Sequence, residues 1–250
     1  MLYNIFMTII NLPPELGAAA DSDRRVLLIG ASRGLGLALA QQWVRGGWHV
    51  TATVRGSGRT PLHDLAGNCS GQIQIETVDI TEPAQIAALR TRLADRMFDL
   101  LFVNAGVTNQ PEGTVAETST EEFNRVMVTN ALGPLRVVET LHNHVEPAGT
   151  IAVMSSGQGS VANNRSGGHE VYRGSKAALN TFMRSYAARH SAGHRTLVLM
   201  APGWVRTEMG GPGARLGIDE SIPNVVRTLD TLRGKRGLHY VDYLGRTVPW

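Results

Sequence analysis

Cysteine is almost absent from this 250-residue sequence, which contains only Cys69. A single cysteine cannot form an internal disulfide, and no neighbouring residues give it the spacing of a metal site, so we expect a reducing, cytoplasmic location. Long apolar runs are also lacking, and Pro13 and Pro14 interrupt the apolar start before a signal-peptide core is complete. No stretch approaches the run of about 20 apolar residues that a spanning helix needs, so we expect no membrane segment.

Excess charge of either sign is lacking as well. The net charge is +3, and the Arg residues are scattered rather than gathered in one stripe, which argues against nucleic-acid binding. Hydrophobic residues make up 42% and charged residues 18% of the chain, a balance typical of globular proteins. We therefore expect one domain over residues 24–250, preceded by an extension over residues 1–23.

Complete metal-ligand sets are missing too. His142 and His144 lie close together in the sequence, as do His190 and His194, but neither pair is accompanied by a carboxylate or a cysteine. We expect no metal site.

What the chain does contain is a regular alternation of short apolar runs with segments of helical periodicity. Strands are expected at 25–30, 48–54, 73–80, 99–106, 149–156, 195–203 and 237–245, and helices at 35–47, 83–96, 121–145, 170–190 and 221–234. This alternation is typical of βαβ units. It predicts an α/β fold, a Rossmann-type doubly wound parallel sheet of about seven strands with helices on both faces.

Three glycines, Gly30, Gly34 and Gly36, stand where the first strand should turn into the first helix. Glycine permits a sharp turn and a close approach to a pyrophosphate, while the helix N-terminus presents free N–H groups. The spacing is G-x3-G-x-G, and its simpler explanation is a tight turn without a ligand. The strand and helix on either side favour a dinucleotide site.

The second strand ends without the carboxylate that usually accepts an adenosine ribose hydroxyl, because Val54 and Arg55 occupy that place. Arg33 and Arg55 together suit a 2′-phosphate, since guanidinium groups match phosphate oxygens. The alternative is two solvated arginines in an Arg-rich chain. We expect NADP(H) to be favoured over NAD(H).

Lysine is scarce, with only Lys176 and Lys235, and one of them follows Tyr172 by four residues. In a helix this spacing puts both side chains on one face. An adjacent ammonium stabilises a phenolate, so we expect a lowered pKa for Tyr172, which would suit a general acid/base. Taken alone, the pair is also compatible with a tyrosine packed on an aliphatic lysine stem.

Seven motifs in order extend this pattern along the chain: "GASRGLG", "VDI" at 78–80, "NAG" at 104–106, Asn130 in "VTNALGP", "SS" at 155–156, "YRGSK" and "PGWVRT". From about residue 25 onward the chain resembles the short-chain dehydrogenase/reductase family, classical type. Within it, "APGWVRTEMGGPGARLGIDES" and the closing "GRTVPW" resemble the branch of sniffer-type carbonyl reductases and C-factor-like proteins.

The resemblance implies a role for each matching position. The catalytic residues would be Tyr172 as proton donor, Lys176 on the nicotinamide ribose, Ser156 on the carbonyl oxygen, and Asn130 holding a water in the proton relay. The remaining cofactor-binding positions would be Gly30, Ser32, Arg33, Gly34, Leu35, Gly36, Arg55, Asp79, Ile80, Asn104, Ala105, Gly106, Pro202, Gly203, Val205 and Thr207.

Two of these assignments have support of their own. Phe123, Met127, Asn130 and Pro134 share one helical face, so Asn130 interrupts an apolar stripe and is expected to point inward, where its amide needs partners. The serine is less direct. Many family members have it thirteen residues before the tyrosine, which is Gly159 here. Ser160 competes with Ser156, and we favour Ser156 because it ends a strand; Ser155 should face the other way.

These features predict an NADPH-dependent enzyme that transfers hydride to a ketone, aldehyde or quinone, a small-molecule substrate. The alternatives are an NADP-binding signalling protein with little turnover and a secondary-alcohol dehydrogenase running in the oxidative direction. Trp204 and the loop "MGGPGARLG" are expected to shape the pocket. By analogy with the family, we expect a homodimer or homotetramer.

Overall fold

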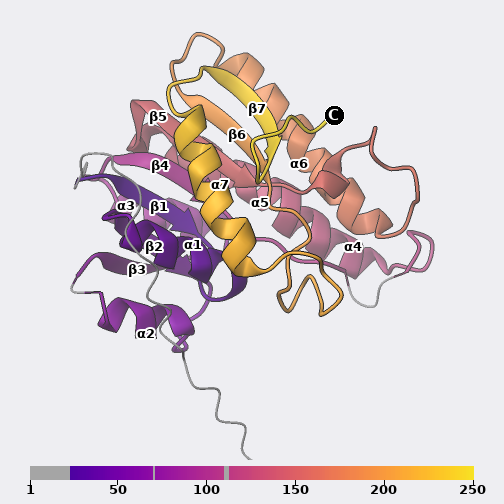
Figure 1. Cartoon of the computed structure of the whole chain (residues 1–250), viewed down its shortest axis with the longest axis horizontal. Coiled ribbons are helices and arrows are strands. Elements are labelled where there is room, and N and C mark those ends of the chain that lie inside the picture. The colour runs from indigo at the N-terminus through magenta and orange to yellow at the C-terminus, as the bar shows by residue number, and fades with distance from the viewer. Residues whose placement is uncertain (1–22, 70, 110–112) are drawn as a thin grey trace, which may run out of the picture.

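The computed structural model describes residues 23–69, 71–109 and 113–250. Its strands are β1 (Arg25–Ile29), β2 (His49–Val54), β3 (Ile73–Thr77), β4 (Phe98–Val103), β5 (Val145–Met154), β6 (Thr196–Ala201) and β7 (Gly237–Asp242). All seven belong to one parallel sheet in the order β3-β2-β1-β4-β5-β6-β7. The Rossmann-type fold expected from the sequence is confirmed (Figure 1).

The helices are α1 (Gly34–Arg45), α2 (Pro61–Gly67), α3 (Pro83–Arg92), α4 (Thr120–Met127), α5 (Gly133–Leu141), α6 (Glu170–Arg189) and α7 (Ile218–Leu232). The single helix expected over 121–145 is wrong in detail. A π-helical segment, Val128–Leu132, separates α4 from α5, and Val145 already begins β5. The short helix α2, which starts with Pro61 after the N-cap Thr60, was not expected.

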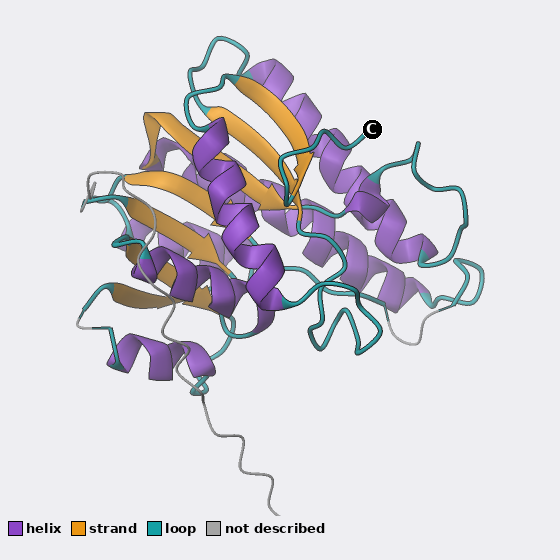
Figure 2. Ribbon diagram, in the orientation of Figure 1, coloured by secondary structure: helices purple, strands orange, loops and turns teal. Residues whose placement is uncertain are grey.

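Side chains alternate between the two faces of the sheet, as the pleat requires. Leu27 and Ile29 of β1 point to the face covered by α3, α5 and α6, whereas Val26 and Leu28 point to the face covered by α1, α2 and α7. Figure 2 shows α7 and α1 in front of the strands and the other layer behind. Because both faces are covered, β6 is buried along its whole length.

The sheet order changes direction between β1 and β4. The chain winds outward from β1 to β3 on one side and from β4 to β7 on the other. In folds of this kind, ligands bind at the carboxyl edge of the sheet beside such a switch in strand order.

The expected extension, residues 1–23, lies outside the described residues except for Asp23, which is exposed. Among the described residues, no helix is both long and apolar enough to cross a membrane.

Candidate functional site

The expected site residues gather along the carboxyl edge of the sheet. Gly30 follows β1, Asn104 follows β4, Ser156 follows β5 and Pro202 follows β6, although up to 172 residues separate them in the chain. The parallel topology brings these strand ends side by side across the switch in strand order (Figure 1).

The glycine turn after β1 is closely packed. Gly30 has φ +89°, a backbone conformation that side chains rarely adopt, and a Cβ on Gly36 would lie 2.1 Å from the Gly30 carbonyl oxygen. Asn104 Nδ2 donates to that same carbonyl at 2.7 Å, and Thr53 Oγ1 accepts from the Gly30 N–H at 2.9 Å. Asn104 therefore ties the end of β4 to the turn, and Gly36 lets α1 approach it.

The turn leaves the N-terminus of α1 open. Arg33 occupies the N-cap position without a side-chain hydrogen bond to the helix, so no side chain of that residue covers the first N–H groups. Arg33 instead forms an ion pair with Glu208 at 2.8 Å, in which both side chains are about three-quarters exposed, at 73% and 74%. Ser32 and Leu35 lie within this turn, and Arg55, just after β2, is exposed.

Beyond β3, Asp79 and Ile80 form a compact corner. The Asp79 carboxylate accepts from the Thr81 N–H at 2.9 Å and from the Thr81 hydroxyl at 2.7 Å. Ile80 is buried, and a Cβ on Gly133 would lie 2.9 Å from its carbonyl oxygen. The small residue at the start of α5 therefore lets that helix approach the corner.

Tyr172 and Lys176 lie in the first two turns of α6 and share one face, as their spacing predicts. Lys176 is only 2% exposed, and its Nζ donates to the Met154 carbonyl oxygen at 2.9 Å, near the end of β5. Its ammonium lies 5.9 Å from the centre of the Tyr172 ring. Burial lowers the pKa of Lys176 from 10.5 to about 8, because a charged group loses water there.

The expectation of a lowered pKa for Tyr172 is not met in this structure. Burial of the phenol raises the pKa of Tyr172 above 10.0, and the hydrogen bond with the Ser156 side chain lowers it by less. The Lys176 ammonium donates to the Met154 carbonyl and is not among the groups that shift this pKa. Tyr172 is therefore a neutral, proton-carrying phenol over the physiological pH range.

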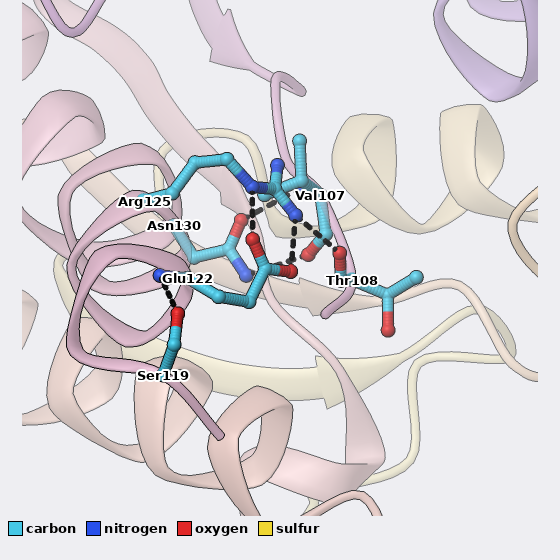
Figure 3. A network of polar contacts seen from close by, with 6 residues as sticks. All are labelled: Val107, Thr108, Ser119, Glu122, Arg125 and Asn130. Carbon is cyan, nitrogen blue, oxygen red and sulfur yellow. Dashed lines mark hydrogen bonds and ion pairs between the residues drawn. The ribbon is translucent and has the colours of Figure 1, made fainter. Parts of the chain in front are cut away.

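Asn130 points inward, as expected, and is completely buried within the π-helical segment. Its Oδ1 accepts from the Val107 N–H at 2.8 Å, and its Nδ2 donates to the Val107 carbonyl at 2.8 Å and to Ser175 Oγ at 2.9 Å. Figure 3 shows this amide against the segment that follows β4. π-Helical turns often occur at functional sites, and here the turn aims a buried amide at the backbone beside Gly106.

The same segment is held from its outer side by an ion pair. Arg125 of α4 bonds to both carboxylate oxygens of Glu122 and donates to the Thr108 carbonyl at 2.8 Å. Ser119 caps α4 by accepting from the Glu122 N–H at 3.2 Å, and Figure 3 shows these contacts together. Phe123 of this helix differs from expectation, because it is 38% exposed rather than part of an inward apolar stripe.

Gly106 packs between the two polar groups of the site. A Cβ placed on it would lie 3.3 Å from Asn130 Oδ1 and 3.4 Å from Lys176 Nζ. The "NAG" sequence therefore places Asn104 at the glycine turn. Two residues later, Gly106 has no side chain, so its backbone can lie close to Lys176 and Asn130.

The three serine candidates are clearly separated. Ser156 is the one whose hydroxyl bonds with Tyr172, while Ser155 faces the other way and donates to Asn180 Oδ1 at 2.6 Å. Ser160 is buried, accepts from the Asn163 N–H at 3.1 Å and donates to the Trp250 carbonyl at 3.4 Å. The preference for Ser156 is supported.

The family's usual serine position, Gly159, has no room for a side chain here. A Cβ on Gly159 would lie 2.9 Å from Asn180 Nδ2 and 3.0 Å from both the carbonyl carbon and the Cβ of Lys176. The short 3-10 turn at Gly157–Gly159 therefore packs its backbone directly on α6, and the serine that reaches Tyr172 stands three residues earlier.

The segment after β6 forms the wall of the site on the far side of β5 from the glycine turn. Gly203 has φ +85°, and Ser221 Oγ donates to the Pro202 carbonyl at 2.7 Å. Val205 is buried and pairs with Leu216, and Thr207 Oγ1 accepts from the Gly210 N–H at 3.0 Å.

The loop expected to shape the pocket is built on this wall. Trp204 is 55% exposed, although its Nε1 donates to the Gly210 carbonyl at 2.8 Å. Arg206 donates to the carbonyls of Ala214 and Arg215 at 3.0 and 2.9 Å. The loop thus has internal hydrogen bonds while presenting an indole to solvent.

One cluster of potential metal ligands was not foreseen. His142 and His190 end α5 and α6, and in the fold they pair with each other and with Glu139, with ligand atoms within 4.8 Å of one another. Arg189 already forms an ion pair with Glu139, and the charge of Arg195 contributes to the lowered pKa of His142, after burial and His190. Two nearby guanidinium groups oppose a cation, so we assign no metal there.

Sequence reasoning missed the residues that support the expected set. Ser175 Oγ accepts a hydrogen bond from Asn130 Nδ2 and donates one to the Tyr172 carbonyl at 2.7 Å. Asn180 Oδ1 accepts a hydrogen bond from the Ser155 hydroxyl, and its Nδ2 donates one to the Gly159 carbonyl at 3.1 Å. Both lie on the same buried side of α6 as Lys176, and a polar residue at such a position is the one signal that could have indicated them.

Comparison with known proteins adds to this geometry. The family model described as short chain dehydrogenase matches residues 24–214. A crystal structure of a short-chain dehydrogenase/reductase from Burkholderia multivorans with bound NADP is 59% identical, with a TM-score of 0.90; the match covers 91% of this chain and 99% of that one.

Two further matches fall in the expected branch. The carbonyl reductase Sniffer of D. melanogaster is 27% identical with a TM-score of 0.82, and the match covers 91% of this chain and 99% of that one. The C-signal protein of Myxococcus xanthus is 35% identical over 165 residues, which are 65% of this chain and 99% of that protein. Since the family model spans most of the described fold, the chain belongs to the short-chain dehydrogenase/reductase family of oxidoreductases.

Proposed function

We propose that the protein is an NADPH-dependent reductase of ketones, aldehydes or quinones, with Tyr172 as its general acid/base. The observation that carries this proposal is the meeting of four groups at one edge of the sheet. The Tyr172 phenol bonds with Ser156, and the Lys176 ammonium and the Asn130 amide lie around Gly106. A protein that only binds a dinucleotide has no need of all four groups.

The residues at the carboxyl edge fit a dinucleotide. The open N-terminus of α1 beside the tight Gly30–Gly36 turn suits a pyrophosphate, because free N–H groups and the helix dipole favour an anion. Lys176 is buried, donates one hydrogen bond to the Met154 carbonyl and retains donors for ribose hydroxyls. When bound, a reduced nicotinamide supplies the hydride for a carbonyl carbon. Asp79, Ile80, Asn104, Ala105, Gly106, Pro202, Gly203, Val205 and Thr207 would border the rest of the molecule.

Each residue then has a defined task at the substrate. Ser156 donates a hydrogen bond to the carbonyl oxygen and orients it toward Tyr172. Tyr172, which its raised pKa keeps protonated, gives its proton to that oxygen as the carbon accepts the hydride, and the product is an alcohol. Lys176 stabilises the phenolate that this transfer leaves behind, and Asn130 holds the water through which the proton is replaced.

The 2′-phosphate of NADP(H) would lie between Arg33 and Arg55. The Arg33–Glu208 pair is highly exposed, and such surface pairs contribute at most about 1 kcal/mol, so a phosphate can replace Glu208 as the partner of Arg33. The NADP bound to the Burkholderia relative supports the same preference.

Two alternative functions are compatible with the same site. The Ser, Tyr, Lys and Asn set also serves a secondary-alcohol dehydrogenase working in the oxidative direction, because the proton transfer is reversible. The similarity to C-signal leaves room for a signalling protein with little turnover. Turnover itself separates that reading from the enzyme.

We also propose that residues 24–250 form one NADP-binding domain and that a second copy of the chain packs on α4, α5 and α6. Phe123, Leu132 and Phe182 are each about 40% exposed there, at 38%, 38% and 42%. Leu132 and Phe182 line a shallow apolar hollow with Leu135. The cytoplasm is the proposed compartment, in keeping with the single Cys69.

The general-acid role is tested with Tyr172→Phe. We expect kcat for NADPH-dependent reduction to fall at least 100-fold, the scale of a lost acid/base catalyst, with the Kd for NADPH within threefold of the unchanged protein. The assay follows NADPH oxidation over a panel of diketones, quinones and aldehydes, and NADP+ reduction over secondary alcohols. Equal turnover in the variant would remove Tyr172 from the mechanism, and no turnover with any compound would favour the signalling reading.

The cofactor preference is tested with Arg55→Ala. Loss of a charge-assisted contact to a phosphate should weaken NADPH binding about 10- to 100-fold and leave NADH binding unchanged. Titration calorimetry with both cofactors measures this. Arg59→Ala is the matched control, because Arg59 lies in the same loop and is already paired with Asp64. A preference for NADH in the unchanged protein would contradict the assignment.

Pairing through the apolar hollow is tested with Phe182→Asp. Light scattering after size-exclusion chromatography should give a dimer or tetramer for the unchanged protein and a monomer for the variant, because a buried aspartate without a partner opposes association. Val161→Asp is the control, an exposed apolar residue on another part of the surface. A monomeric unchanged protein at assay concentrations would count against this interface.

A further inference from the structure

The strand β7 ends at Asp242, and the chain then folds back along it. Gly245 and Arg246 close a tight turn on Asp242, through a 2.9 Å bond from the Gly245 N–H to the Asp242 carbonyl and a 2.7 Å ion pair with Arg246. The Val248 N–H then donates to the Tyr240 carbonyl at 2.8 Å. The segment after β7 therefore returns to Tyr240 and ends beside Ala162 of the loop that follows β5.

Tyr240 reaches the backbone of the serine expected to orient the substrate. Its side chain is 3% exposed, and its hydroxyl donates to the Ser156 carbonyl oxygen at 2.5 Å. Burial raises the pKa of Tyr240, so this phenol stays protonated and remains a donor at neutral pH. The same carbonyl accepts from the Gly159 N–H at 2.9 Å, so the Tyr240 bond adds a contact from β7 to a carbonyl that already closes the 3-10 turn.

Trp250 holds the other end of the same loop. Its main-chain oxygen accepts from the Ala162 N–H at 2.9 Å and from Ser160 Oγ at 3.4 Å. Its ring contacts the Tyr240 ring, with centroids 5.4 Å apart, and the Arg184 guanidinium of α6 lies 4.7 Å from its centre.

We propose that Tyr240 and Trp250 are positioning residues that fix the two ends of loop 156–162 and thereby hold the Ser156 hydroxyl at Tyr172. This rests on the proposed reductase function. Ser156 lies just beyond β5 and caps the short 3-10 turn Gly157–Gly159. Within this turn the Gln158 N–H donates to Ser156 Oγ at 3.1 Å, and the bond from Tyr240, 84 residues away, ties the turn to β7.

The arrangement also explains why Ser160 is buried although it does not reach Tyr172. Its hydroxyl is used within the loop, between the Asn163 N–H and the Trp250 carbonyl. Because these two contacts keep the Ser160 hydroxyl within the loop, it cannot also bond to a substrate.

Tyr240→Phe is the direct test. It removes one hydroxyl and keeps the ring that packs on Trp250. We expect kcat to fall 10- to 100-fold, since a small misplacement of a catalytic group has effects of that size, with the substrate KM and the NADPH Kd within twofold. Hydrogen exchange of residues 157–162 should become faster. Tyr186→Phe is the matched control, because Tyr186 is an equally buried tyrosine farther along α6 and should leave both kcat and the exchange of this loop unchanged.

Trp250→Leu provides a second variant. It keeps the main-chain oxygen that Ala162 and Ser160 contact, and it removes the ring that packs on Tyr240 and Arg184 and holds that oxygen in place; the residue is 41% exposed. It should lower kcat with the same unchanged NADPH affinity. A kcat within twofold of the unchanged protein in both variants would overturn the proposal. If the unchanged protein reduces no carbonyl, the reductase function fails instead, and the exchange of residues 157–162 still decides the clamp: exchange equal to that of the unchanged protein in both variants overturns it.

Discussion

A single buried ammonium sets the conditions for this site. Lys176 is almost completely enclosed, and a charge in that position needs donor–acceptor contacts to offset the water that it has lost. The end of β5 supplies one through the Met154 carbonyl, and Gly106 after β4 leaves the ammonium room. Since the unfolded chain keeps the ordinary pKa of 10.5 and the folded chain has about 8, the unfolded state binds more protons between these values. This group therefore makes the folded state gain stability as pH rises from about 8 to about 10.5, and below pH 8 the enclosed charge is a full cost. Unfavourably buried charges with shifted pKa values are concentrated at functional sites.

The other parts of the site surround that charge. The π-helical turn sends Asn130 into the same space and thereby fixes Val107, while α6 carries Tyr172 one turn before the lysine. The sheet order reverses between β1 and β4, and the carboxyl ends of strands at such a switch are where dinucleotides bind in folds of this kind. The pKa of Tyr172 is high because its phenol is buried beside an ammonium that points elsewhere. A proton donor, rather than a base, is what the reduction of a carbonyl requires from that position.

Much of this was accessible from the sequence because it depends on local periodicity. Short apolar runs between helical segments predict a parallel sheet, and an asparagine in an apolar stripe predicts a buried amide. Strand ends also favour Ser156 over Ser160. What failed depends on contacts between distant segments. No local pattern distinguishes a π-helical turn from an α-helix at Val128–Leu132, so 121–145 read as one helix. The sequence paired each histidine with its neighbour, whereas the fold pairs His142 with His190 and Glu139. The bond from Tyr240 to Ser156 has no signal in either segment. The direction of the Tyr172 pKa required knowing where the Lys176 side chain points, which spacing along a helix cannot tell.

The enclosed lysine is also the feature most open to direct measurement, because the chain has only two lysines, Lys176 and Lys235. In a Lys235→Arg variant produced with isotopically labelled lysine, Lys176 gives the single lysine signal in a nuclear magnetic resonance spectrum. The change of this signal with pH gives the pKa of Lys176. We predict a pKa near 8 for the unliganded protein, which rises when NADPH is added because ribose hydroxyls and phosphate charges favour the ammonium. A pKa close to 10.5 that NADPH leaves unchanged would contradict the claim that Lys176 is an enclosed charge waiting for the cofactor.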